Sequence, residues 1–331
     1  MNLDSSTVYD TNRQPQELGA LLAQGGEGAI HPLRQRPDIL VKRYHPQVLA
    51  KRGPALRAKV EAMRTVAALR ADKRLSWPLI SVFDAQHDWV GYGMYRAQGV
   101  PMFHLAHAKL YQNNFPNLDR PRLVRYLIAL VEQVQALHAQ GVMVGDYNLH
   151  NILCDPASDA VTLIDCDSYQ LQLNGQHYPC PVGSPDMTPR EQHGQSFERL
   201  IRTPHSEAFS LAIVLFKGLM LGRHPYDIVD GADPVENLRR GTFAYGIGNR
   251  GIPKGAWYNI WSHMPHRLKT LFIQTFTEGA GEPQRRATLD EWLDVLRLYE
   301  REMHKGWHAT EVKPPQPKAQ TYRGSQSQAS A

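Results

Sequence analysis

Short apolar runs dominate the first third of the chain. They occupy residues 21–22, 39–41 and 89–94, and Gly or Pro residues separate them. Runs of this length and spacing are typical of strands in a small sheet. Residues 54–70 differ, because their apolar positions recur at helical spacing, and they predict one helix among the strands. The positions that define this helix are Leu56, Val60, Met63 and Ala67.

The second half of the chain carries longer, helical patterns. Asp119 and Pro121 form a helix-start signal, and apolar residues follow at helical spacing as far as Gly141. Residues 206–222 form a second stretch that is almost entirely apolar, which predicts a helix buried on most sides. Between these helices, apolar runs at 151–154 and 161–164 flank an Asp-Pro turn and predict a hairpin.

The order of these patterns predicts an α+β fold in which a small β-rich part precedes a larger helical part. We place a polar N-terminal segment at 1–16, the β-rich part at 17–96, the helical part at 97–305 and a polar tail at 306–331. The tail lacks apolar periodicity and is rich in Lys, Pro, Gln and Ser. We therefore expect it to be disordered, and we expect its removal from about Lys313 onward to change the melting temperature little.

The composition is that of a globular protein. The chain has 331 residues, of which 42% are hydrophobic and 21% charged, enough for one large domain or two parts around a cleft. The net charge of +5 is concentrated, because ten Lys and Arg residues stand between Lys42 and Arg74, against Glu61 and Asp72. The simplest interpretation is a solvated basic helix face. A docking surface for an acidic partner is the alternative, and we expect no nucleic-acid partner.

Cysteine usage and hydropathy narrow the class of protein further. Cys154, Cys166 and Cys180 lack CxxC spacing, so they support neither a zinc site nor a disulfide framework. No apolar leader precedes the polar start, and no run of about eighteen apolar residues occurs. These features predict a cytoplasmic protein with no membrane partner.

A glycine-rich segment in the β-rich part is a candidate phosphate-binding loop. Gly25, Gly26 and Gly28 follow an apolar pair, and glycines let a backbone turn approach a polyphosphate closely. Taken alone, such a cluster is more often a simple turn.

Two charged residues further along could complete such a site. Lys42 ends the apolar run 39–41 and could face inward to hold phosphates, or it could lie exposed at a strand edge. Glu61 could orient that lysine through an ion pair. The alternative for Glu61 is a surface ion pair with Arg57 or Lys59 on the same helix.

The strongest local signal lies at 144–151, where the sequence reads Val-Gly-Asp-Tyr-Asn-Leu-His-Asn. Asp146 stands five residues before Asn151, at the mouth of the predicted hairpin. There Asp146 would align an acceptor hydroxyl, and Asn151 would hold a metal ion. Asp165 directly follows the second strand of the hairpin and is placed to bind Mg²⁺ that bridges phosphates. An Asp after a strand is also a common turn former. The assignment of Asp165 to a metal site therefore depends on the other candidate residues, Asp146 and Asn151.

These residues stand in the order and spacing of the protein-kinase motif set. Over about residues 18–300, the chain resembles a bacterial protein kinase of the eukaryotic type. The resemblance implies a bilobal fold with a small β-rich lobe and a larger helical lobe. It also implies transfer of the γ-phosphoryl group of ATP, with Mg²⁺ or Mn²⁺, to a Ser or Thr hydroxyl of a protein substrate.

The resemblance assigns the nucleotide site to the β-rich part. Gly25, Gly26 and Gly28 would cover the phosphates. Ile30 would pack over the adenine. The backbone near Met94 would bind the edge of the adenine ring.

The resemblance also assigns the chemistry. Lys42, held by Glu61, would grip the α- and β-phosphates. Asp146 would be the catalytic aspartate. Asn151 and Asp165 would hold one or two metal ions, with Asp165 as the first residue of a DFG-like triplet.

Similarity continues beyond the chemistry. The segment Thr188-Pro-Arg-Glu191 is similar to the motif that closes the activation segment, and Arg286 resembles the buried arginine that pairs with its glutamate. Glu207 stands where an aspartate usually begins the following helix. Together with the Gly-Gly-Glu-Gly loop and the Asp-Cys-Asp stretch, these residues are similar to a narrower group. Those kinases are encoded with a von Willebrand A-type protein and a PPM-type phosphatase, which are therefore candidate partners.

The sequence departs from the family pattern at three places. The residues before the catalytic aspartate are Val144 and Gly145, the DFG-like triplet is Asp165-Cys-Asp167, and Asn148 replaces a lysine that contacts the γ-phosphate. The departures leave two alternatives open, a small-molecule phosphotransferase and a nucleotide-binding pseudokinase that acts as a scaffold. Because only Asp165 directly follows the strand, we expect substitution of Asp167 to leave appreciable activity.

Gly145 carries a prediction about regulation. In many protein kinases this position holds an arginine that pairs with a phosphate on the activation segment. Glycine has no side chain for that purpose. We therefore expect activity not to require phosphorylation at Ser168, Tyr169, Ser184 or Thr188, and to depend on a partner or on the position of the helix after Lys42.

Overall fold

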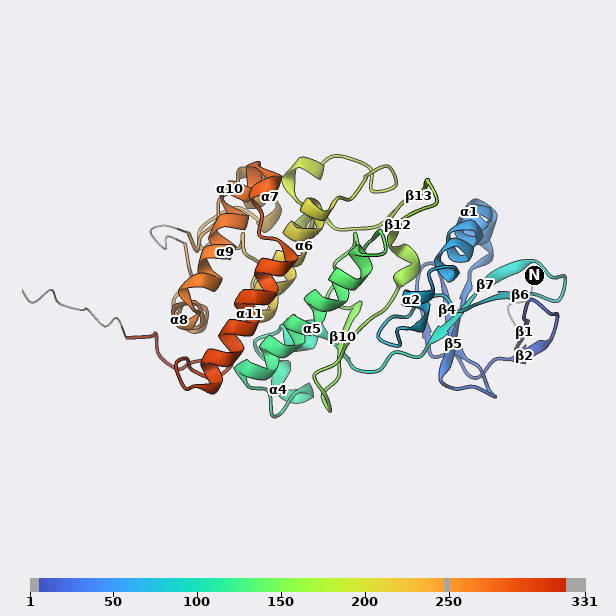
Figure 1. The fold of residues 1–331 in the computed structure, drawn as a ribbon, viewed down its shortest axis with the longest axis horizontal. Helices are drawn as coiled ribbons and strands as arrows, with labels where there is room; N and C mark the ends of the chain where they lie inside the picture. Colours follow the sequence, from blue (N-terminus) through green and yellow to red (C-terminus); the bar gives the residue numbers. More distant parts are fainter. Residues whose placement is uncertain (1–5, 247–250, 320–331) are drawn as a thin grey trace, which may run out of the picture.

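The computed structural model describes residues 6–246 and 251–319. A seven-stranded antiparallel sheet forms one end of the molecule and helices form the other (Figure 1). The mixed α/β structure predicted from the sequence is thereby confirmed. The strands, in the order in which they lie in the sheet, are β2 (Pro15–Glu17), β1 (Thr7–Tyr9), β6 (Ile80–Phe83), β7 (Trp89–Tyr95), β5 (Ile39–Tyr44), β4 (Gly28–Pro32) and β3 (Ala23–Gln24).

Strand β5 directs Lys42 toward the site. Side chains alternate between the two faces of a strand, so Lys42 shares a face with Leu40 and Tyr44. These two residues pack in one core cluster with Val60 of helix α1 (Pro46–Arg64). The other face of β5 packs in a separate cluster with Val8 of β1. Lys42 therefore lies on the side of the sheet that α1 covers.

Helix α1 begins earlier than the sequence predicts. The apolar spacing predicts a start at about Pro54, and proline is favoured in the first turn of a helix. The structure instead uses Pro46 at that position, directly after His45, and Pro54 lies inside the helix. A second short helix, α2 (Ala67–Ala71), follows the end of α1.

The helical part is built around two buried helices. In α5 (Arg120–His138), the Asp119 side chain accepts a hydrogen bond from the Arg122 N–H at 2.8 Å, which confirms the predicted start signal. Helix α6 (Pro204–Leu219) is buried along most of its length, as predicted, and packs against α5 and α9. The remaining helices are α3 (Met102–Leu105), α4 (Tyr111–Asn114), α7 (Pro234–Arg240), α8 (Ala256–His263), α9 (His266–Phe276), α10 (Glu278–Gly281) and α11 (Leu289–His304).

Two small three-stranded sheets link the two ends of the molecule. The predicted hairpin is present as β10 (Ile152–Cys154) and β11 (Val161–Leu163), and β8 (Val100–Pro101) adds a third strand. The second sheet comprises β9 (Val142–Met143), β12 (Gln170–Leu173) and β13 (Gln176–Tyr178). Figure 1 shows the β12–β13 hairpin extending toward α1.

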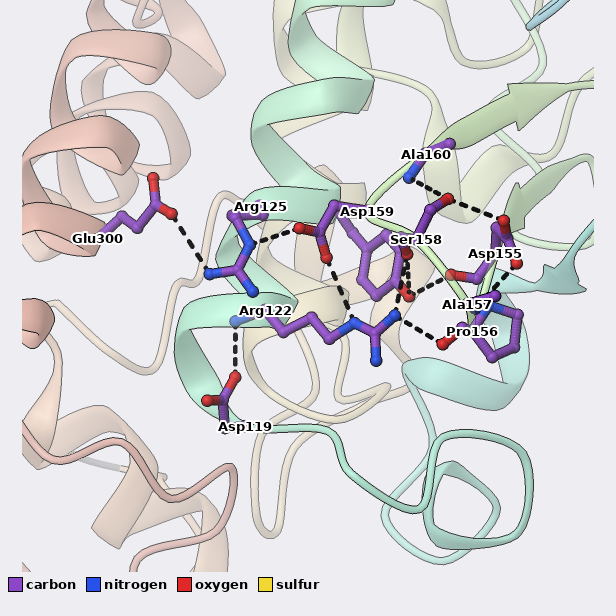
Figure 2. A network of polar contacts seen from close by, with 11 residues as sticks. Asp119, Arg122, Arg125, Asp155, Pro156, Ala157, Ser158, Asp159, Ala160 and Glu300 are labelled. Carbon is purple, nitrogen blue, oxygen red and sulfur yellow. Dashed lines mark hydrogen bonds and ion pairs between the residues drawn. The ribbon is translucent and has the colours of Figure 1, made fainter.

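The turn of the β10–β11 hairpin is tied to two helices (Figure 2). The Arg122 guanidinium donates to the carbonyls of Pro156 and Ser158 at 2.6 and 3.0 Å. Arg125 pairs with Asp159 at 2.7 Å and with Glu300 of α11 at 3.4 Å. The network thus anchors the turn of the hairpin whose open end carries Asn151 and Asp165.

The N-terminal segment is more ordered than its polarity suggests. Residues 7–17 form the hairpin β1–β2, and Val8 is buried against the sheet. A single buried apolar residue in a three-residue strand is too short a signal for periodicity to detect. By contrast, the apolar pair Leu21 and Leu22 forms no strand and is about half exposed, at 52% and 51%.

The described part of the tail packs on the helical part, contrary to expectation. Val312 is buried, and its carbonyl accepts a hydrogen bond from the buried Arg120 side chain at 2.6 Å. The Asn259 side chain of α8 donates to the carbonyls of Pro314 and Pro315. Side chains of the body thus bind tail backbone, and apolar periodicity gives no sign of such contacts. The tail prediction for 320–331 lies outside the described residues, as does that for 1–5.

None of the helices in the described ranges combines the length and the hydrophobicity needed to cross a lipid bilayer.

Candidate active site

A cavity of about 980 Å³ opens between the sheet and the helical part. Its lining brings together residues from seven separate stretches of the chain. The predicted site residues on its wall are Gly25, Gly26, Gly28, Ile30, Lys42, Asp146, Asn151 and Asp165. Of the residues proposed from the sequence, only Glu61 and Met94 are absent from this lining.

The glycine loop connects β3 and β4 at the mouth of the cavity. A Cβ atom on Gly28 would lie 2.4 Å from the Arg43 carbonyl oxygen, so the pairing of β4 with β5 requires glycine there. Gly25 and Gly26 have open space where a Cβ would stand. The loop is therefore fixed at one end and has room for a ligand at its tip.

Lys42 lies at the centre of a buried charge cluster. Its Nζ donates to Asp165 Oδ1 at 2.8 Å and to the two oxygens of Asp167 at 2.9 and 2.7 Å. Burial alone would lower the pKa of Lys42, but the charges of Asp167 and Asp165 raise it well above its usual value. Lys42 is therefore a permanent cation facing the cavity.

Asp167 is the main partner of Lys42, which the sequence analysis did not predict. Its side chain is 3% exposed, and it also accepts hydrogen bonds from the Tyr44 and Tyr92 hydroxyls at 2.5 and 2.7 Å. Burial would raise the pKa of Asp167, but Lys42 and the two tyrosines hold it below its usual value. The expectation that Asp167 is dispensable loses its basis, because this residue anchors the lysine.

Glu61 does not pair with Lys42. Its carboxylate instead contacts Arg64, one turn along α1, and the Ser81 hydroxyl of β6. The reason is the phase of the helix, because packing against the sheet turns Val60 and Lys59 inward and leaves Glu61 at the side. The second interpretation weighed for Glu61, a helix-surface ion pair, is the better one, with Arg64 as the partner.

Met94 also lies outside the cavity. Its side chain is 7% exposed and packs with Leu40 and Tyr44 in the core between the sheet and α1. The adjacent pairing of Met94 with Leu40 in the sheet fixes this orientation. The assignment of Met94 to the nucleotide site is therefore a proposal about its backbone, not about its side chain.

Two further charged residues of the cavity were missed. Glu27, at the tip of the glycine loop, lies 3.8 Å from Lys42 Nζ and forms an ion pair with Arg52 of α1. Lys59 of α1 is 7% exposed and donates to the Pro179 carbonyl at 2.9 Å. Burial lowers the pKa of Lys59 to about 8. Lys59 does not stand out in the sequence because it lies in a stretch crowded with charges, and Glu27 appears there only as part of the glycine loop.

A buried glutamate of helix α6 binds the backbone of the loop that carries Asp146. Glu207 of α6 is 1% exposed and accepts hydrogen bonds from the backbone N–H groups of Val144 and Gly145 at 2.8 and 3.0 Å. The Tyr147 hydroxyl donates to the same carboxylate at 2.8 Å. Helix α6 therefore fixes the backbone on both sides of Asp146.

Asp165 and Asn151 lie side by side at the open end of the β10–β11 hairpin. The Ile164 N–H donates to the Asn151 carbonyl at 2.9 Å. Asp165 adopts a left-handed backbone, with φ of 59°, which aspartate tolerates better than most residues. Burial and the neighbouring Asp167 raise the pKa of Asp165, and burial and Asp165 raise the pKa of Asp146. Added positive charge would relieve this repulsion.

These residues fit an Mg²⁺ ion only in part. Within 6–246 and 251–319, no group of three or more His, Cys, Asp or Glu side chains is arranged to hold a metal by itself. Mg²⁺ commonly binds one or two protein oxygens and completes its shell with phosphates and water. Asp165 and Asn151 match that use, so a metal here would need a phosphate ligand to accompany it.

The predicted pairing between Glu191 and Arg286 is present. The two Nη atoms of Arg286 contact the two Glu191 oxygens at 2.8 and 2.9 Å, and the Arg286 side chain is fully buried. Arg286 also donates to the carbonyls of Gly279 and His205. This fork-to-fork contact ties the segment around Glu191 to the helical part.

Comparison with known proteins finds two similar curated sequences. The chain is 28% identical over 310 residues to Protein kinase YegI of Escherichia coli O157:H7, and 28% identical over 309 residues to Protein kinase YegI of Escherichia coli K12. Both alignments cover 90% of this chain. The chain spans about half the length of these curated relatives, 47% in each case. No protein-family model matches the chain.

Proposed function

We propose that this protein is an Mg²⁺- and ATP-dependent protein kinase that transfers the γ-phosphoryl group of ATP to Ser or Thr hydroxyls of a protein substrate. One observation carries the proposal. Lys42, Asp146, Asn151 and Asp165, which lie far apart in the sequence, line one cavity beneath a glycine loop. The similarity to bacterial proteins named protein kinase supports the same activity. A protein-kinase-like, bilobal arrangement around this cavity is part of the proposal.

Each residue has a role in this proposal. The backbone around Gly25 and Gly26 covers the phosphates, and Lys42 binds two of them as a fixed cation. Asp146 accepts a hydrogen bond from the substrate hydroxyl and aligns it for in-line attack. The raised pKa of Asp146 makes it a better hydrogen-bond acceptor and proton carrier than an exposed aspartate.

Asp165 and Asn151 would hold the metal. When bound there with ATP, Mg²⁺ would offset the negative charge that develops on the transferred group. The Asp165 carboxylate contacts Lys42, the proposed phosphate-binding lysine, at 2.8 Å. The same carboxylate would therefore bind both this lysine and the metal. Asn148 supplies no charge, and Lys59 is a second cation on the cavity wall.

The Glu191–Arg286 contact favours a protein as the substrate. It holds residues 188–192 at the edge of the helical part, where a peptide platform is expected by resemblance to protein kinases. A small-molecule phosphotransferase needs no such platform. A nucleotide-binding scaffold remains the second alternative, because Asn148 and Gly145 replace residues that assist transfer in many kinases. Partnership with a von Willebrand A-type protein and a PPM-type phosphatase is the least supported part of the proposal.

The test is incubation of the purified protein with Mg²⁺ and γ-³²P-ATP, alone and with candidate protein substrates. Label on Ser or Thr of a protein supports the proposal. Label on a small molecule, or nucleotide binding with no transfer, would support one of the two alternatives. Asp165→Asn should reduce transfer at least about 100-fold, whereas Asp294→Asn, an exposed change on α11, should not.

A further inference from the structure

Arg202 is a buried cation without a carboxylate partner in the described residues. It is 4% exposed and lies just before α6. Its guanidinium donates to the Cys180 carbonyl at 2.9 Å, the Val182 carbonyl at 2.8 Å and the Phe197 carbonyl at 3.3 Å. A buried charge is costly unless it is fully hydrogen-bonded, and here backbone carbonyls supply the bonds.

The Arg202 clamp, meaning its guanidinium with the carbonyls of 180 and 182, touches the residue before Asp146. Gly145 has φ of +74°, and a Cβ there would lie 2.7 Å from Cys180 Sγ and 3.3 Å from Arg202 Nε. The space beside Gly145 is therefore filled by the Cys180 side chain, with the Arg202 guanidinium next to it. A side chain at 145 would have to displace the Cys180 side chain first.

The clamp is tied to the site by two more contacts. The Gln170 side chain of β12 exchanges two hydrogen bonds with the Arg202 backbone, at 2.8 and 2.9 Å. Strand β12 pairs with β9, which leads directly into the Asp146 loop. On the other side, Lys59 of α1 binds the Pro179 carbonyl. Residues 179–182 are thus held from the helical part and from α1 at once.

The charge of Arg202 also acts on Asp146. Burial and Asp165 raise the pKa of Asp146, Arg202 opposes them, and Asp186 adds a smaller effect in the same direction as Asp165. Arg202 therefore lies near enough to favour the ionised form of the aspartate that receives the substrate hydroxyl.

We propose that Arg202 is a positioning residue of the transfer site, holding residues 179–182 and the Asp146 loop together without an added phosphate. The inference rests on the proposed function for its effect on rate. It goes beyond that function because it identifies Arg202, a buried cation bound to backbone carbonyls, as the residue that orders segment 179–182. The position of Gly145 alone indicated only that a phosphate-binding side chain is missing.

The experiment compares Arg202→Met, Arg202→Lys and the matched control Arg199→Met, an exposed change three residues away. We expect Arg202→Met to lower kcat at least about 30-fold, with KM for ATP changed less than about three-fold, because Lys42 and the glycine loop are untouched. Arg202→Lys keeps the charge and part of the bonding, so its kcat should fall between. Arg199→Met should match the wild type.

Two measurements separate the clamp from a general loss of folding. Hydrogen exchange without substrate should show faster exchange of amides in 176–201 in Arg202→Met, with α5 and α6 unchanged. The wild type, stripped of phosphate and checked by intact mass, should keep its initial rate. A wild-type kcat in Arg202→Met, unchanged exchange, or a tenfold lower rate after phosphate removal would each overturn the inference. If the wild type transfers no label at all, the proposed function fails, and the exchange measurement still decides the clamp.

Discussion

The two sides of the cavity hold their charges in different ways. On the sheet side, the buried cation Lys42 is matched by the buried anion Asp167 and by Asp165. On the helical side, the equally buried Glu207 is bound by two backbone N–H groups and a tyrosine hydroxyl, and the His138 ring lies 3.4 Å from the same carboxylate. Arg202, its positive counterpart there, is bound by carbonyl oxygens. The sheet side thus pairs opposite charges, whereas the helical side binds each charged side chain mainly through neutral backbone groups.

This difference determines which changes of charge each side of the cavity can tolerate. Removing one partner of a buried ion pair leaves an uncompensated charge and is strongly destabilising. An ion bound mainly by backbone dipoles depends less on any one partner side chain, but it fixes the backbone geometry around it. The sheet side is therefore suited to binding a charged ligand, which can replace one ion partner by another. The helical side is suited to keeping Asp146 in one place.

The largest effect should come from Asp167→Asn. The amide keeps the shape but removes the charge opposite Lys42, so we expect the free energy of unfolding to fall by about 2–4 kcal/mol. Transfer should fall at least about 100-fold, because Lys42 loses its main anchor. Urea unfolding and initial rates of label transfer measure the two effects.

Asp165→Asn is the matched control for that variant. It should abolish transfer but change stability much less, because the Asp165 side chain is 42% exposed. The lowered pKa of Asp167 stabilises the fold above its unfolded-state pKa, near about 3.9, and this contribution is lost as pH falls further. Acid unfolding should therefore be shallower in Asp167→Asn. A near-normal rate of transfer and a near-normal free energy of unfolding in Asp167→Asn would contradict the contrast drawn between the two sides of the cavity.

Glu207→Gln tests the helical side and should have a smaller effect. The amide offers one acceptor oxygen where the carboxylate offers two, so at least one of the groups that bind it loses its partner. We expect a loss of about 1–3 kcal/mol in the free energy of unfolding and about tenfold in rate. Glu282→Gln, the same change at a position 65% exposed, is the control. A loss as large as that of Asp167→Asn would show that charge matters equally on both sides.

Ending the chain after Glu311 extends the test to the tail. This removes Val312 and leaves the buried Arg120 without one of its two carbonyl partners, Leu219 being the other. We expect the free energy of unfolding to fall by about 1–3 kcal/mol. A chain ending at Ala319 keeps every described tail contact and should melt like the full chain. Equal melting of both truncated chains would show that the tail contacts add no stability.

Glu61→Gln should have the smallest effect. Its side chain is 40% exposed and its ion pair with Arg64 lies on the helix surface, so we expect less than about 0.5 kcal/mol in stability and less than about twofold in rate. Thermal melting and label transfer measure both. A large loss of activity with normal melting would return Glu61 to the lysine-orienting role that its place in the sequence suggested.

Local signals in the sequence were enough for part of the site. Asp146, Asn151 and Asp165 could be placed because each follows a recognisable helix or strand at short spacing. Lys42 could be placed because it ends an apolar strand. In each case the neighbouring residues along the chain decide where the side chain points.

The partners of these residues could not be predicted in the same way. Whether Glu61 or Lys59 faces the cavity depends on how α1 packs on the sheet, not on its own pattern. In the Asp165-Cys-Asp167 stretch, the left-handed backbone at Asp165 turns Asp167 inward, and no local spacing shows this. The Arg202 side chain binds backbone carbonyls, and Val312 is bound through its own carbonyl. Because every residue provides a carbonyl, the sequence does not mark these contacts.

Arg120 has a consequence for how the protein responds to ionic strength. It is buried, and among the described residues its side chain binds only the carbonyls of Leu219 and Val312. Dissolved ions screen the attraction between exposed charges, with a Debye length of about 8 Å at physiological salt that shortens as salt rises, but they screen buried contacts much less. Rising salt should therefore loosen the partly exposed Glu27–Arg52 link at the tip of the glycine loop while the tail stays bound. The entrance of the cavity would then become more mobile, and the described tail residues around Val312 would not.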